Sequence, residues 1–186
     1  MKNIMNICFL LLFSACSSNR VVVDYLEKEM RYNQKSSEYI LIKEKEKQKK
    51  AFTVMRGMGI LKDDKTSVFS GTKFFTNNEM KQIEKQVVRS NDGDEWKKSD
   101  FKNISFIIKS NKNDSILQHI KEKISKKENT YIYSFSEPFF LENKKLAFFL
   151  ITKSSTLNSD NYIKSVIMRK EQGKWIIVDE VYNTDL

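Results

Sequence analysis

The side chains in this 186-residue sequence that could do chemistry form no catalytic pattern. His119, the only histidine, lies beside Gln118 on the polar side of a predicted helix. A general base or a metal ligand needs partners, but no second histidine and no H-E-x-x-H spacing accompany it. The serines lack a G-x-S-x-G nucleophile elbow. We therefore interpret His119 as a solvent-exposed surface residue and predict a non-enzymatic protein without a metal or a cofactor.

Two neighbouring acids, Asp179 and Glu180, lie in a predicted strand near the C-terminus. Because successive strand residues point to opposite faces, one of the two must face the core or a cavity. A carboxylate in a cavity has a raised pKa and is a candidate functional group. If the sheet curves around a pocket, we expect Trp175, Phe148 and Asp179 to line it. Otherwise the aromatic residues form the core of the sheet.

The N-terminal segment indicates export. Lys2 precedes an apolar run from Ile7 to Phe13, which is typical of a secretory signal and too short to span a membrane. The next small residues end in a cysteine, and together they resemble the lipobox of bacterial lipoproteins: Phe13-Ser14-Ala15-Cys16. Phe13 departs from the usual Leu or Val. The resemblance implies a diacylglyceryl group on the Cys16 thiol and removal of residues 1–15. The alternative is an ordinary secretory signal with an incidental cysteine.

Cleavage before Cys16 would also remove Cys8, the only other cysteine. The mature chain would then have no disulfide and no free thiol. Two or three acyl chains would hold it firmly on a membrane, whereas one chain gives only marginal binding. We expect a bacterial cell-envelope location, at the outer membrane and facing the periplasm. Ser17 and Ser18, without an aspartate after the cysteine, resemble an outer-membrane sorting pattern.

The net charge of +9 does not indicate nucleic-acid binding. Such binding needs basic residues clustered with stacking aromatic residues. Here the 28 lysines and 5 arginines are spread through every segment. The excess charge favours attraction to anionic lipid head groups or envelope polymers. The expected partners are therefore a membrane, through the lipid anchor, and an unidentified protein or small ligand.

The first part of the chain reads as a tether followed by helices. We expect residues 16–50 to be a lipid-anchored tether that passes into a charged helix, with an imperfect helical rhythm over 23–42. The charged run 43–50 has the composition of a solvated helix face or a flexible spacer. Residues 51–61 favour a strand or a packed loop. Thr76 and Glu79 form a capping box for a helix that ends near Ser90.

From residue 104 onward, strands dominate. We expect a strand over 104–108, a second helix over 116–124, and then four strands separated by turn residues: 131–136, 146–152, 162–170 and 175–182. Tight turns between successive strands require antiparallel pairing. Residues 51–186 should therefore form a single α+β domain, with the helices packed on a C-terminal antiparallel sheet.

Three segments of this region also resemble a group of uncharacterised lipoproteins from Bacteroidota: Ser136-Glu137-Pro138-Phe139, Leu146-Ala147-Phe148 and Gly173-Lys174-Trp175. The likeness covers about residues 74–182 and consists of turns and core positions. It implies a lipoprotein and no particular activity.

We therefore expect a lipid-anchored envelope protein with a non-enzymatic binding or accessory role. Two alternatives remain open. One is a small-ligand-binding module of the NTF2-like type, in which a curved sheet encloses a pocket. The other is an immunity-type lipoprotein that binds a toxin in the periplasm.

Overall fold

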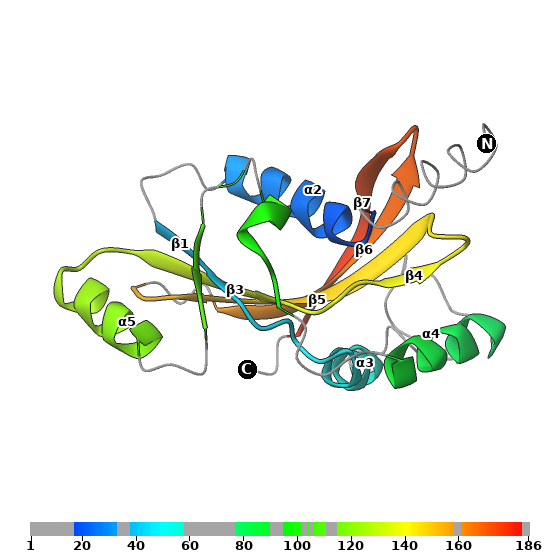
Figure 1. Cartoon of the computed structure of the whole chain (residues 1–186), viewed down its shortest axis with the longest axis horizontal. Helices are drawn as coiled ribbons and strands as arrows, with labels where there is room; N and C mark the ends of the chain where they lie inside the picture. Colours follow the sequence, from blue (N-terminus) through cyan, green and yellow to red (C-terminus); the bar gives the residue numbers. More distant parts are fainter. Residues whose placement is uncertain are drawn as a thin grey trace, which may run out of the picture.

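The structure is a computed structural model that describes residues 17–32, 38–57, 77–89, 95–101, 104, 106–110, 115–157 and 161–183. These residues form a curved, open sheet with helices on both of its faces (Figure 1). The predicted α+β class is confirmed. The proposed signal peptide, Cys16 and Thr76 of the capping box lie outside the described residues.

The sheet has seven strands: β1 (Glu38–Ile42), β2 (Ile107–Lys109), β3 (Thr130–Phe135), β4 (Phe139–Leu141), β5 (Leu146–Ser155), β6 (Tyr162–Glu171) and β7 (Lys174–Asn183). Their order is β2-β1-β3-β5-β6-β7, and β4 pairs with β5. The expected antiparallel meander is therefore confirmed as β3, β5, β6 and β7. Its last turn has positive φ at Gln172 and Gly173, which suits a two-residue hairpin.

The helical pattern expected over 23–42 is confirmed for residues 23–32, which belong to a helix, and is corrected at its end by the strand β1. It pairs in parallel with both β2 and β3. Tyr39 and Leu41 pack in one hydrophobic cluster, while Ile40 and Ile42 belong to another. A strand that is buried on both faces reads as a continuous apolar run, so its period of two is hard to distinguish from a helical period.

Within the described ranges, four α-helices and one 3₁₀ helix cover this sheet: α2 (Ser17–Tyr32), α3 (Gln48–Gly57), α4 (Asn77–Arg89), α5 (Ser115–Ser125) and η1 (Lys98–Phe101). The helices α4 and α5 confirm their predictions. Residues 51–57, expected as a strand or a loop, belong to α3, which buries Ala51 and Met55. In Figure 1, α2 lies on one side of the sheet and α3, α4 and α5 lie on the other. We call these sides the α2 face and the α4 face.

The helix α2 is part of the core, and this finding corrects the tether expected over residues 16–50. Its side chains Val22, Tyr25 and Leu26 are fully buried. They share one hydrophobic cluster with Phe149 and Val166 of the sheet. An apolar helix side buried to this extent gives α2 one fixed position on the curved sheet.

We predict that Leu26→Ala lowers the free energy of unfolding by about 3 kcal/mol, because it leaves a cavity between α2 and the sheet. Lys28→Ala, at an exposed position of the same helix, is the matched control and should change stability by less than about 0.5 kcal/mol. Urea unfolding followed by circular dichroism measures both. Equal effects would mean that α2 does not pack as described.

Candidate functional site

A buried lysine is the most unusual polar group on the α2 face. Lys164 of β6 is only 2% exposed. Its Nζ lies 2.9 Å from Oε1 of Glu180 on β7 and 3.7 Å from Oε2 of Glu29 on α2. Lysine is almost never fully buried unless it is paired. The ammonium group therefore connects two strands of the sheet to the helix that covers them.

Three tyrosine rings surround this ammonium group. The ring centroids of Tyr25, Tyr162 and Tyr182 lie 5.2, 4.8 and 5.2 Å from Lys164 Nζ, within the range of cation–π attraction. The Tyr25 hydroxyl lies 3.1 Å from carboxylate oxygens of both Glu29 and Glu180. The Tyr162 hydroxyl donates to Glu29 Oε1 at 2.9 Å. We call Lys164, Glu29, Glu180 and these three tyrosines the Lys164 cluster.

The cluster keeps Lys164 protonated. Burial alone would lower the pKa of Lys164, but the hydrogen bond to Glu180 and the charges of Glu29 and Glu180 outweigh it. The pKa of Lys164 therefore lies above its ordinary value. Burial, together with the nearby carboxylates, raises the pKa values of Tyr25 and Tyr162 well above the usual range for a phenol. At neutral pH, Lys164 is therefore charged, whereas Tyr25 and Tyr162 are neutral.

A second buried lysine lies beside the Lys164 cluster. Lys153 of β5 is 4% exposed, and its Nζ lies 4.4 Å from the Tyr131 ring and 5.3 Å from the Tyr162 ring. Lys153 and Tyr162 are also cross-strand partners. Lys153 and Lys164 therefore both lie near the Tyr162 ring inside the α2 face. The contacts of the Lys164 cluster link α2 to strands of the sheet. Its geometry is therefore that of a structural interaction between the helix and the sheet.

Sequence reasoning missed this cluster, although a signal was present. Along β6 the residues that face α2 alternate: Tyr162, Lys164, Val166 and Met168. A lysine at an inward position of such a strand requires a buried carboxylate partner. Patterns of neighbouring residues do not reveal the carboxylate partners of Lys164, because Glu29 and Glu180 are separated by most of the chain.

A β-bulge decides which C-terminal acid faces inward. The register between β6 and β7 shifts between Ile167 and Met168, which pair with Asp179 and Ile177. Trp175 and Ile177 face α2 before the shift, whereas Glu180 does so after it. The extra residue in β7 thus exchanges the two faces. Asp179 instead accepts a hydrogen bond from the backbone N–H of Glu180 at 2.8 Å.

The structure does not bring the three expected pocket residues together. Trp175 belongs to the hydrophobic cluster of the α2 face, and Phe148 belongs to the cluster under α3 and α4. Both are buried core side chains. Phe148 is stacked on Phe139 at 5.0 Å, and Trp175 lies near Phe140. Both aromatic residues therefore lie in the core of the sheet, which is the alternative to a pocket.

His119 is not the solvent-exposed residue that the sequence predicts. Its side chain is 18% exposed, and its Nε2 lies 2.7 Å from Oε2 of Glu38. Lys123 Nζ approaches the same carboxylate oxygen at 3.5 Å. The helix α5 thus turns one polar side toward the start of β1. A single helix turn brings both basic groups to Glu38, which links α5 to the sheet.

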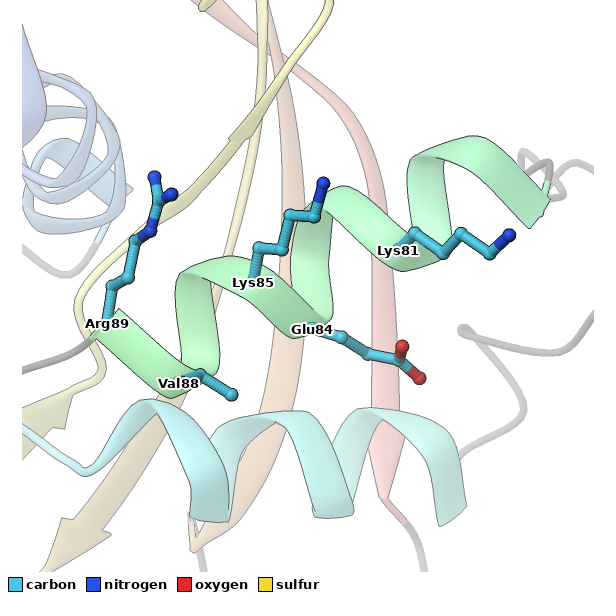
Figure 2. Close-up of a pocket in the computed structure, with 5 residues that line it drawn as sticks. All are labelled: Lys81, Glu84, Lys85, Val88 and Arg89. Carbon is cyan, nitrogen blue, oxygen red and sulfur yellow. The ribbon is translucent and has the colours of Figure 1, made fainter.

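A shallow hollow of about 290 Å³ lies along α4, and Figure 2 shows its lining. Among the described residues, those that line it come from this helix: Lys81, Glu84, Lys85, Val88 and Arg89. In Figure 2, Lys85 and Arg89 extend to one side of the helix, whereas Glu84 extends to the other. These five side chains therefore do not converge on one point.

Comparisons with protein-family models, curated proteins and solved structures give no significant match. Within the described residues, no group of three or more His, Cys, Asp or Glu side chains is arranged to hold a metal ion. In the same part of the chain, no helix is long and apolar enough to cross a membrane.

We predict that Lys164→Met lowers the free energy of unfolding by about 3 kcal/mol at neutral pH, because it leaves two carboxylates without their buried cation. Adding Glu180→Gln should recover part of this loss, since one uncompensated charge is removed. Lys170→Met, at an exposed position of the same strand, is the control. Denaturant unfolding measures all three variants. Equal stability of Lys164→Met and Lys170→Met would contradict a stabilising ion pair.

The tyrosines predict a loss of stability in alkaline solution. Tyr25 and Tyr162 have raised pKa values in the folded state, while phenols in the unfolded chain ionise near their model value of 10.0. Their contribution is therefore complete below pH 10 and falls as the pH rises above it, because the unfolded state releases protons first. Replacing both by Phe should reduce the slope of this decline. Unfolding curves across this pH range measure it, and a slope unchanged from that of the wild-type protein would contradict the prediction.

Proposed function

We propose that this protein is a lipid-anchored protein of the bacterial envelope, with an acyl-modified Cys16 and a folded body that has a non-enzymatic binding or accessory role. The lipobox-like residues 13–16 support the anchor. We place the body on the periplasmic side of the outer membrane, following the serines after the cysteine. The non-enzymatic role rests on the sequence, in which no histidine, serine or cysteine stands in a catalytic pattern.

The start of α2 is the observation that carries the proposal furthest. The helix begins at Ser17, one residue after Cys16, and its apolar side is buried in the core. One residue of chain spans at most about 3.6 Å. An acyl group on Cys16 would therefore hold the folded body directly at the bilayer surface, with no spacer between them. Such an arrangement suits a protein that acts at the membrane surface.

The small-ligand alternative needs an opening between α2 and the curved sheet. In the described residues this interface contains the side chains of Val22, Tyr25 and Leu26, together with the Lys164 cluster. A ligand could enter only if α2 moved and those contacts broke. An immunity-type protein would share the anchor and would differ in its partner.

We predict that the mature protein begins at Cys16 and carries an acyl mass on it. Intact-mass and peptide mass spectrometry of protein purified from membranes would show this directly. Cys16→Ser should remove the acyl mass and release the protein from the membrane pellet, since the hydrophobic attachment is lost. Ser18→Ala is a control that leaves the thiol in place. A wild-type N-terminus without an acyl group would overturn the proposal.

The binding role has its own test. Cross-linking in intact envelopes, followed by purification and mass spectrometry, should recover a specific partner with the wild-type protein. The partner should be lost with Cys16→Ser, which removes the protein from the membrane surface. If the wild-type protein recovers no more cross-linked partner than Cys16→Ser does, a membrane-dependent binding role is contradicted.

A further inference from the structure

Five basic side chains lie together at one end of the sheet. They come from the turn between β4 and β5 and from the hairpin between β6 and β7, and all are exposed: Lys144, Lys145, Arg169, Lys170 and Lys174. The backbone N–H of Lys170 donates to the carbonyl of Lys145 at 2.8 Å, which joins the two turns. Residues 142–145 and 169–174 also contain two acids, so five cations and two carboxylates give a net charge of +3. We call these ten residues the basic tip.

The basic tip adjoins the start of α2. The backbone N–H of Trp175, next to the hairpin turn, donates to the Asp24 carboxylate in the first half of this helix. Farther along α2, Glu29 contacts Lys164 and Tyr162, toward the other end of the two strands. The helix therefore begins at the hairpin-turn end of β7. In Figure 1 the start of α2 and the β6–β7 hairpin lie at the same end of the molecule, and α5 lies at the opposite end.

We propose that the basic tip is a membrane-contacting surface that binds the anionic phospholipid head groups of the leaflet that holds the acyl chains. This inference rests on the proposed function, because an anchor on Cys16 would bring the start of α2 to that leaflet. Exposed charges act over about 10 Å in moderate salt, so only basic residues close to the anchor gain from the lipid charge. Each such residue raises binding about fivefold at an anionic surface. The Lys164 cluster, which fixes α2 on the sheet, would make the orientation of the whole body depend on this contact.

The test measures which end of the protein faces the lipid. A donor dye is attached to Lys174→Cys in the basic tip or to Lys121→Cys on α5, each in a Cys8→Ser background. Mass spectrometry verifies the labelled position. The full-length protein is expressed with its own leader, purified from membranes and placed on vesicles of phosphatidylcholine and phosphatidylglycerol that carry an acceptor on the head group. We expect at least twofold more energy transfer from the tip than from α5.

Two changes should remove this difference. One replaces phosphatidylglycerol by phosphatidylcholine, and the other is Lys144→Glu with Lys145→Glu. The matched control reverses the charge of two exposed lysines at the α5 end, in the protein that is labelled at the tip. The substitutions are Lys121→Glu and Lys127→Glu. Lys144 and Lys127 both have positive φ in turns, so the two pairs impose similar backbone demands. The control should leave energy transfer from the tip unchanged.

The outcomes separate this inference from the proposed function. Equal energy transfer from both ends would overturn the proposal that the basic tip contacts the membrane, even when Cys16 carries its acyl mass. Energy transfer from the tip that does not depend on phosphatidylglycerol would overturn it as well. If Cys16 carries no acyl mass, the proposed function fails. In that case a tip signal that still requires phosphatidylglycerol supports the lipid-binding surface by itself, and the absence of such a signal overturns it.

Discussion

The need to neutralise one buried ammonium group constrains much of this structure. Lys164 cannot stay charged inside the α2 face without carboxylates, and these come from α2 and from β7. Glu180 reaches it only because a bulge exchanges the two faces of β7. Glu29 reaches it only when α2 lies along the curved sheet in one direction. The ion pairs thus add a directional requirement to the non-directional burial of Val22 and Leu26.

This constraint also links the interior to the N-terminus. A displacement of α2 would break its apolar contacts and would also leave the buried charge of Glu29 unpaired. The position of Ser17 relative to the β6–β7 hairpin is therefore set from within the protein. Under the functions that we propose, the fixed position of α2 on the sheet determines which surface of the protein faces the membrane when Cys16 is anchored.

Local patterns predicted local structure well in this chain. The capping box that includes Glu79 predicts α4, and the helix predicted over 116–124 is α5. Turn residues separated the four strands of the meander, whose pairing followed from the short connections. The predictions were wrong where a strand is buried on both faces, or where residues far apart in the sequence contact each other. The parallel strand β1, the core position of α2 and the contact of His119 with Glu38 belong to this group.

By itself, the sequence determined the α+β class, the antiparallel meander and the lipobox-like motif, because each depends on neighbours a few residues apart. Only the tertiary structure decided which polar residues meet. Glu29, Lys164 and Glu180 lie on three elements far apart along the chain, and their meeting depends on sheet curvature, a bulge and the direction of α2. Trp175 and Phe148 were separated in the same way, since the pleat of the sheet assigns them to opposite faces.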